Sequence, residues 1–174
     1  MSSLNQVQLR FIPVEDRLLL QIRTAEAEYR LWMTRRYVRL LWPVLLDLLA
    51  SNAQVQSQAD PHNRSQVLSF QHEQALRQAD FTTRYRENEA SMPLGAAPVL
   101  LSRIQVRRRD GESRVLSLRP AEGPGVELNI NDAFLHSFCK LLADTAANAG
   151  WDLELGLGLA APVQGADAPP ERVN

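Results

Sequence analysis

The chain has one cysteine, few aromatic residues and no apolar run long enough to cross a bilayer. The single thiol, Cys139, cannot form an internal disulfide, and a lone cysteine in an apolar segment is more typical of a small buried side chain than of a reactive group. The longest apolar-dense stretch, residues 37–50, is interrupted by Arg39, Pro43 and Asp47. It is also shorter than the roughly 20 residues that a membrane-spanning helix needs. We therefore predict a buried helix there and no membrane contact.

The N-terminal residues lack the basic stretch, apolar core and small-residue cleavage site of a secretion signal. The absence of a possible internal disulfide also suits a reducing compartment, so we expect a cytoplasmic protein. The net charge of -1, the hydrophobic fraction of 45% and the charged fraction of 22% are those of an ordinary globular protein. The overall composition therefore points to no particular class of partner.

The signatures of catalysis and of metal binding are missing too. The three histidines, His62, His72 and His136, lack the spacing of a metal site, and we expect His136 to lie partly exposed on a helix. No P-loop, GxSxG or GxGxxG motif is present, since Gly-Leu-Gly at residues 156–158 has no third glycine and no following helix. A pairing of His136 with Cys139 could activate a thiolate, but the apolar context and the lack of an orienting third group argue against it. We predict a protein that is not an enzyme and that has no metal and no cofactor.

What the sequence does contain is an internal repeat. Residues 19–26, Leu-Leu-Gln-Ile-Arg-Thr-Ala-Glu, align with residues 115–122, Val-Leu-Ser-Leu-Arg-Pro-Ala-Glu. After one inserted residue the match continues through two segments with an apolar residue at every second position, which is the period of a strand with one buried face. The aligned apolar positions are Tyr29 with Val126, Leu31 with Leu128 and Met33 with Ile130.

Both copies then reach the start of a predicted helix. Thr34 aligns with Asn131, and both residue types are good N-caps because a side-chain oxygen can accept a hydrogen bond from the first turn. Apolar residues follow at three- and four-residue spacing, as in a helix with one buried face. The aligned helix positions are Tyr37 with Phe134, Val38 with Leu135, Leu41 with Phe138 and Leu45 with Leu142. Agreement of turn, strand, cap and helix in one order predicts a duplication.

Each paired unit is preceded by another predicted strand, Val7–Ile12 in the first half and Val99–Arg109 in the second. The turn-forming segment Arg109–Ser113 joins the latter to the next strand. Further strands are predicted at Phe81–Arg86 and Trp151–Leu157, where apolar and polar residues alternate. The expected fold class is α+β, with two β-β-β-α units whose antiparallel sheets pack on helices around a pseudo-twofold axis.

The units divide the chain into four parts. The first unit spans residues 1–53 and the second spans residues 96–159. Between them, residues 54–95 form a polar insertion with a helix at Ser65–Ala79. Residues 160–174 have no periodicity and are expected to be a disordered tail.

The first predicted helix is apolar around much of its circumference. Leu40, Trp42 and Leu46 lie off the main apolar stripe, so the helix should be buried on two sides. One side would cover its own sheet, and the other would meet the rest of the chain or another subunit. Pro43 removes one backbone hydrogen bond inside the helix and predicts a kink.

The opposite face of the predicted sheets is rich in arginine. Because strand side chains alternate, the residues between the buried positions share this face, and residues 1–53 carry seven arginines against five acidic residues. The predicted face comprises Arg10, Arg23, Arg30 and Trp32 in the first unit, and Arg103, Arg107 and Arg119 in the second.

Two strand-rich units that are each closed by a helix are similar to the general plan of the Whirly and PUR-repeat single-strand-binding folds. The likeness is one of architecture, without a shared motif. It implies that phosphates bind the arginines and that unstacked bases lie on aromatic rings, so single-stranded DNA or RNA is one predicted partner. The alternative is a solvated face on which the arginines pair with acidic neighbours, namely Glu26, Glu28, Glu112 and Glu127.

A second function class needs fewer assumptions. The first helix and the exposed strand edges can mediate self-association as a homo-oligomer, or docking on a protein partner. We therefore predict a non-enzymatic binding or assembly protein that acts in this way, with single-stranded nucleic-acid binding as the alternative.

Overall fold

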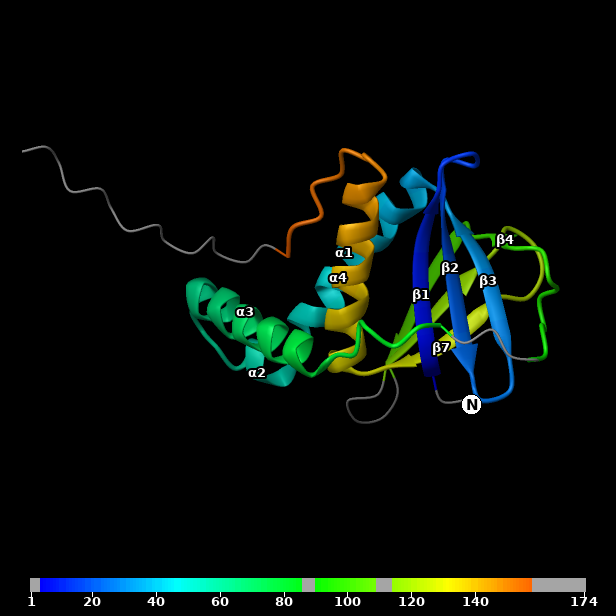
Figure 1. Cartoon of the computed structure of the whole chain (residues 1–174). Helices are drawn as coiled ribbons and strands as arrows, with labels where there is room; N and C mark the ends of the chain where they lie inside the picture. The colour runs from blue at the N-terminus through cyan, green and yellow to red at the C-terminus, as the bar shows by residue number, and fades with distance from the viewer. Residues whose placement is uncertain (1–3, 86–89, 109–113, 158–174) are drawn as a thin grey trace, which may run out of the picture.

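The computed structural model describes residues 4–85, 90–108 and 114–157. Within these residues the chain forms a mixed α+β fold with four helices and two sheets whose strand pairs are mostly antiparallel. Figure 1 shows the two sheets lying one behind the other, with the helices gathered to one side of them. The expected α+β class is thus confirmed.

The first sheet has the strand order β1-β2-β3-β4. It consists of β1 (Leu4–Ile12), β2 (Arg17–Thr24), β3 (Glu28–Met33) and the short β4 (Val99–Leu100). The strands β1, β2 and β3 form antiparallel hairpins, whereas β4 comes from the other half of the chain and pairs with β3 in parallel.

The second sheet has the order β5-β6-β7. Its strands are β5 (Arg103–Arg108), β6 (Arg114–Arg119) and β7 (Val126–Ile130), and both pairs are antiparallel. Buried and exposed residues alternate along β7, because this strand has one face toward the core and one toward solvent.

The two sets of three antiparallel strands, β1-β2-β3 and β5-β6-β7, are here called hairpin series. A long helix follows the third strand of each. These helices are α1 (Arg35–Ala50) and α4 (Asp132–Asn148), and they contact each other. Thr34 caps α1 by accepting a hydrogen bond from the Tyr37 amide, and Asn131 caps α4 by accepting one from the Phe134 amide. The two predicted N-caps are therefore confirmed.

Two further helices, α2 (Ala53–Gln56) and α3 (Pro61–Gln78), lie in the sequence between α1 and β4. They project away from the sheets in Figure 1. Leu68, which is 9% exposed, is the one residue of α3 that is buried, so α3 packs on α2 and α4 as a peripheral helix.

The two hairpin series share the same pairing register. Leu20 stands opposite Leu9 and Leu31, and Leu116 stands opposite Val106 and Leu128. The neighbouring polar positions also correspond: Gln21 and Ser117 are both buried and are both held by side-chain hydrogen bonds. Inward-facing residues of both sheets and of both long helices form one continuous core.

Several expected strands differ from those observed. The strand predicted at Val99–Arg109 is divided into β4 and β5, because Leu101 turns into the core and the Ser102 amide donates to the Arg119 carbonyl. The strands predicted at Phe81–Arg86 and Trp151–Leu157 were wrong: residues 81–85 and 151–157 are not in any strand.

Other expectations are met or lie outside the described residues. The predicted helix at Ser65–Ala79 corresponds to α3, which begins earlier, at Pro61. Helix α1 continues without a break through Pro43, and a kink there stays a prediction. The predicted turn at residues 109–113 and the predicted disordered tail at residues 160–174 fall outside the described residues, while the division into 1–53, 54–95 and 96–159 stays a prediction.

None of the helices in the described part of the chain combines the length and the apolar character needed to cross a membrane.

Candidate functional site: a groove between β1 and α4

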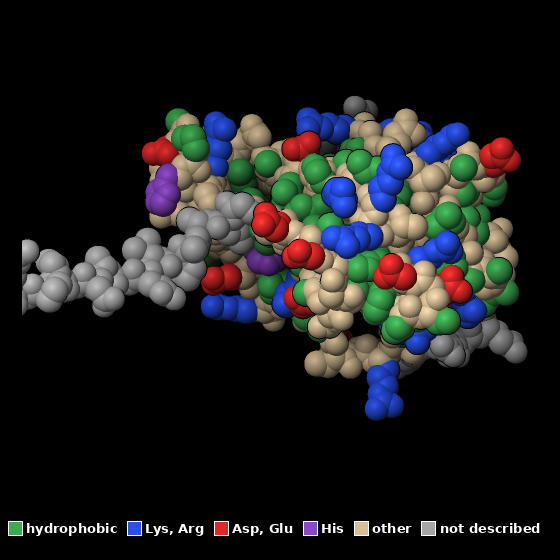
Figure 2. Space-filling model, turned by 90° about the horizontal axis from the view of Figure 1, so that it is seen from above, with side chains coloured by type: hydrophobic (Ala, Val, Ile, Leu, Met, Phe, Trp, Pro, Cys, Tyr) green, Lys and Arg blue, Asp and Glu red, His purple; other side chains and the backbone are tan. Residues whose placement is uncertain are grey.

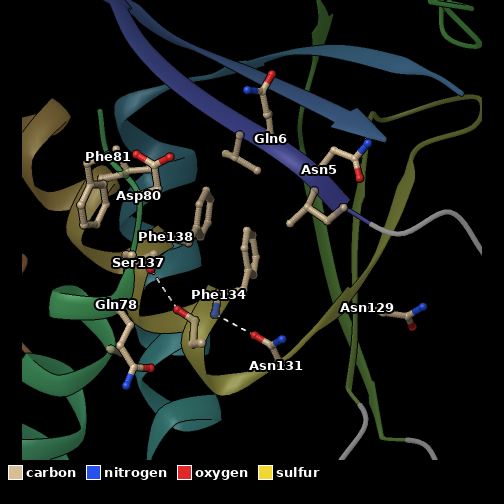
Figure 3. Close-up of a pocket in the computed structure, with 16 residues that line it drawn as sticks. Asn5, Gln6, Gln78, Asp80, Phe81, Asn129, Asn131, Phe134, Ser137 and Phe138 are labelled. Carbon is tan, nitrogen blue, oxygen red and sulfur yellow. Dashed lines mark hydrogen bonds between the residues drawn. The ribbon is translucent and has the colours of Figure 1, made fainter. Parts of the chain in front are cut away.

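A groove of about 770 Å³ lies between β1, α4 and the end of α3. This volume lies within the range of roughly 300 to 1,000 Å³ that is usual for ligand sites. Figure 3 shows Asn5 and Gln6 on the β1 side, Phe134 and Phe138 on α4, and Asp80 and Phe81 after the end of α3. The groove thus lies where the insertion meets both halves of the chain.

Two phenylalanines form the apolar wall on α4. The rings of Phe134 and Phe138 stack with their centroids 5.6 Å apart and an interplanar angle of 13°, because residues four apart lie on one helix face. Leu4, Val7 and Leu141 add aliphatic surface. The wall can therefore accept an apolar or aromatic group of a ligand.

The residue that the predicted repeat aligns with Phe134 is Tyr37, and its surroundings differ from those of the groove. The Tyr37 hydroxyl of α1 donates to the Arg103 carbonyl of β5 at 3.2 Å, and burial raises the pKa of Tyr37 above its ordinary value. The residues at the corresponding positions are Phe134 and Gln6, since Gln6 stands opposite Arg23 as Arg103 stands opposite Arg119. Phenylalanine has no hydroxyl to make this contact, and a groove occupies this position.

The polar groups of the groove are mostly amides. Asn5 and Gln78 line it together with Asp80. Asp80 is exposed, and hydrogen bonds donated first by Thr83 and then by Thr82 hold the pKa of its carboxyl well below the usual range. The groove therefore offers amide donors and acceptors and one fixed negative charge, and none of its lining residues is basic.

The predicted arginine-rich face of the first sheet is tied together by a buried carboxylate. Glu28 is 2% exposed and pairs with Arg30 at 2.7 Å and with Arg23 at 3.7 Å. Tyr85 lies against the same charges, and burial followed by the Glu28 charge raises its pKa to about 12. Arg10 is exposed and donates to Gln21, whereas Trp32 is half-buried.

The arginines of the second sheet are more accessible. Arg103 and Arg107 are exposed on β5, and Arg107 pairs with Glu127 at 2.5 Å, which Arg119 also contacts at 3.2 Å. These contacts, Arg107 first, lower the pKa of Glu127. The structure thus places the predicted residues on two separate sheets, and Figure 2 shows basic and acidic side chains interspersed over the visible face.

The three predicted interaction residues of α1 have different environments. Leu40 is 54% exposed, Leu46 is half-buried against the core, and Trp42 is 5% exposed. The Trp42 indole donates to the Gly156 carbonyl at 3.2 Å. The segment after α4 therefore covers part of the apolar surface that we had predicted to meet another element or a subunit.

Sequence reasoning missed a polar junction between the two halves. Arg114 is 8% exposed and its guanidinium donates to the Leu48 carbonyl and to the Asp132 carboxylate, each at 3.0 Å. Asn52 donates to the other oxygen of the same carboxylate. This junction joins β6, the end of α1 and the start of α4, and no local pattern in the sequence indicates it.

A histidine pair joins α3 to α4. The Nδ1 atoms of His72 and His136 lie 3.1 Å apart. His136 is 3% exposed, so the prediction that it lies partly exposed was wrong, because α3 covers this face of α4. Burial first, and then the neighbouring His72, lowers the pKa of His136 to about 4, while the Asp132 charge acts in the opposite direction.

The chain matches no protein-family model, and no curated protein or solved structure is significantly similar to it. The arrangement of its own residues therefore carries the argument about function.

The cysteine environment gives no support to thiolate chemistry. Cys139 is fully buried, and burial raises its pKa to about 12, so the thiol stays protonated near neutral pH. Among residues 4–85, 90–108 and 114–157, no three histidine, cysteine, aspartate or glutamate side chains are grouped to hold a metal ion.

The histidine pair predicts a loss of stability in acid. The folded state holds His136 neutral, so the unfolded state binds more protons between about pH 6.5 and about pH 4. The pKa of His72 is also lowered, by burial and then by the Lys140 charge, with Glu73 opposing. Urea unfolding should therefore give a free energy about 2 kcal/mol lower at about pH 4.5 than at about pH 7 from His136 alone.

Acidic residues also titrate in this range, so the comparison needs two variants. His136→Gln should reduce the difference between the two pH values, whereas His62→Gln, at an exposed position of α3, should leave it unchanged. An equal pH dependence in all three proteins would contradict the prediction.

Proposed function

We propose that this chain is a non-enzymatic binding protein that docks an extended segment of a protein partner along the groove between β1 and α4. The observation that carries the proposal is the position of β1 at the end of its sheet, directly beside the aromatic wall of Phe134 and Phe138. An outer strand can pair with an extended segment at its edge, and an adjacent apolar pocket can take a side chain. Together these features suit β-strand addition, in which an extended segment of a partner pairs with the edge of a sheet.

The charge of the groove favours a peptide over a nucleic acid. Its lining contains the carboxylate of Asp80 and no arginine or lysine, so a phosphate backbone would meet repulsion there. The amides of Asn5 and Gln78 suit the peptide groups of an extended segment, because each amide can both donate and accept.

We expect a bulky side chain in the groove to abolish peptide binding. Short random peptides displayed on phage would be selected on the immobilised protein, and a selected peptide would be titrated by fluorescence anisotropy. Ala133→Trp, at an exposed position that lines the groove, should weaken binding by about tenfold or more, which is roughly the loss of one good anchor contact.

The matched control is Ala147→Trp, an exposed position further along the same helix that does not line the groove. It should bind the peptide as the wild type does. If no peptide is selected, or if both variants bind equally well, the proposal fails.

Binding of single-stranded nucleic acid is the second candidate, and the exposed arginines Arg103 and Arg107 on β5 favour it. Labelled oligothymidylate and oligouridylate should then bind saturably at low salt and more weakly at physiological salt. Arg103→Glu with Arg107→Glu should remove this binding, whereas Arg77→Glu on exposed α3 should not. Absence of binding at low salt would exclude this candidate.

We further propose that the chain arose by internal duplication of a β-β-β-α unit. The equal register of the two hairpin series and the equivalent caps Thr34 and Asn131 support this. The predicted likeness to the Whirly and PUR-repeat plan, a homo-oligomeric state, and self-association through Leu40 stay predictions. Sedimentation of the wild type and of Leu40→Glu tests the last two.

A further inference from the structure

Helix α3 forms one side of the groove, although little apolar surface attaches it to the rest of the chain. Ala75, Gln78 and Ala79, at the end of the helix, line the groove, and Figure 3 shows Gln78 in this position. Leu68 is the buried residue of α3, whereas Phe70 is 67% exposed. A helix with so few buried apolar contacts can open locally while the rest of the fold stays intact.

The contacts that hold α3 in place are largely polar. The side chain of Gln71 donates to Asn52 at 3.3 Å and to Gln54 at 2.7 Å. The next residue, His72, contacts His136 of α4, and the two Nδ1 atoms lie 3.1 Å apart. A cavity of about 240 Å³ lies beside this contact and is lined by His72 and by residues of α4. The packing of α3 on α4 is therefore loose next to the histidine pair.

The histidine contact requires at least one neutral ring. One Nδ1 atom must donate and the other must accept, and a protonated imidazole offers no acceptor. A first proton leaves one donor and one acceptor in place. A second proton makes both Nδ1 atoms donors and brings two positive charges together. Two charged rings are thus incompatible with the observed position of α3.

We propose that α3 is a pH-dependent wall of the groove, which separates from α4 when His72 and His136 are both protonated, while the sheets, α1 and α4 stay folded. The regulatory consequence rests on the proposed function, because loss of this wall weakens the binding of a peptide in the groove. The separation itself is a property of the free chain.

The charges around His72 come from α3 and α4. Burial, followed by the Lys140 charge, lowers the pKa of His72, whereas the exposed Glu73 acts in the opposite direction. Lys140 also pairs with Asp144 at 2.9 Å. Burial raises the pKa of the neighbouring Cys139 thiol, which therefore stays uncharged. Uncharged side chains of α1 and of the segment after α4 line the same cavity, namely Trp42, Leu155 and Leu157.

The charges around His136 come from α4 and β6. Asp132 favours the charged ring, but its carboxylate is paired with Arg114 at 3.0 Å. Amide side chains of α2 and α3 line the cavity on this side, namely Gln54, Gln71 and Gln74. Burial and the charge of His72 outweigh Asp132, so the pKa of His136 is lowered. The docked helix thus holds the pair neutral near pH 7.

Acid therefore favours the released helix. In the released state both rings return to an ordinary pKa of 6.5, whereas docking lowers the pKa of His72 and lowers that of His136 to about 4. The released state consequently binds more protons below pH 6.5. From His136 alone, the ratio of released to docked α3 should rise about twentyfold between about pH 7 and about pH 5, and His72 adds to this rise.

Hydrogen exchange of the full-length chain without ligand tests the release. Protection factors, which remove the intrinsic pH dependence of exchange, are compared at about pH 7 and about pH 5 for amides of α3, β2 and β6. A helix of this length is marginal in water by itself, so released α3 loses its protection. Its amides should be less protected than those of β2 and β6 at both pH values, and their protection should fall by about twentyfold or more in acid. Protection of α3 that equals that of the sheets, or that does not change with pH, would overturn the proposal.

Histidine variants assign the effect to the pair. An asparagine amide can both donate and accept near the position of Nδ1 but does not titrate, so His72→Asn/His136→Asn should lose the pH dependence of α3 protection. His62→Asn, at an exposed position of the same helix, should retain it. Because replacement of the buried His136 can destabilise the fold, His72→Asn alone, at a half-buried position, provides a second test and should reduce the dependence. The same dependence in His72→Asn as in the wild type would contradict the assignment.

Peptide binding at the two pH values tests the consequence for the groove. A selected peptide without histidine, aspartate or glutamate should bind the wild type more weakly at about pH 5 than at about pH 7, and the double variant equally at both. Asp80 adds no titration of its own, because its pKa is held well below the usual range. Equal affinity for the wild type at both pH values, despite release of α3, would overturn its role as a wall. Failure to select any peptide would refute the proposed function, whereas exchange without ligand decides separately whether α3 is released.

Discussion

Replacement of Arg114 by alanine is expected to lower the free energy of unfolding by about 3 kcal/mol. The guanidinium lies almost completely buried and donates to the Leu48 carbonyl and the Asp132 carboxylate. Its removal leaves a carboxylate and a carbonyl without their charged donor, and this loss exceeds the intrinsic value of the pair. The side chain of Asp132 is 37% exposed, so water can solvate part of it and the loss stays at the lower end of the range for buried pairs.

The measurement is urea unfolding followed by circular dichroism. Arg107→Ala is the matched control, because Arg107 also pairs with a carboxylate but its side chain is 51% exposed, and exposed pairs contribute less than about 1 kcal/mol. Equal losses in the two variants would show that the junction at Arg114 does not hold the two halves together.

Gly125→Ala should lower the free energy of unfolding by about 3 kcal/mol as well, for a steric reason. A Cβ atom at this position would lie 2.2 Å from the Leu118 carbonyl oxygen and 2.8 Å from the Arg119 Cα. Both are backbone atoms of β6, so the hairpin of β6 and β7 must open to accept the methyl group, and overpacking of this kind costs roughly 1 to 3 kcal/mol or more.

A second glycine provides the control. At Gly156 a Cβ atom would have no neighbour within 4 Å, so Gly156→Ala should change the stability by less than about 0.5 kcal/mol. Thermal or urea unfolding of the two variants compares them directly. A small loss for Gly125→Ala would mean that the turn before β7 is wide enough to adapt.

The hairpins and the two capped helices could be predicted from the sequence, because they depend on patterns within a few residues. Alternation identified Leu31 and Leu128 as inward-facing, and both are buried in the core. The same alternation failed at residues 151–157. There Trp151 packs edge-on against Phe11 and its indole donates to Asp16, so contacts with another segment hold this part of the chain, which is not in a strand.

The candidate site was less accessible to prediction because it depends on contacts between distant residues. Alternation placed Arg23 and Arg30 on one face, but it could not show that Glu28 is buried between them. His136 became buried because α3, a helix without a strong apolar face, packs over it. The groove lies at Phe134, the residue that the predicted repeat aligns with Tyr37, whereas Tyr37 itself donates to the Arg103 carbonyl; this difference appears only when the two positions are compared in space.

The position of β4 determines when the first half can be completed during synthesis. Val99 follows its partner Leu31 by 68 positions, so β1, β2, β3 and α1 leave the ribosome well before the strand that covers β3. Closing so long a loop carries an entropic cost before the pairing stabilises anything. Until then the nascent chain exposes an open strand edge, and this interval is when the growing polypeptide is most vulnerable to pairing with other unfinished chains.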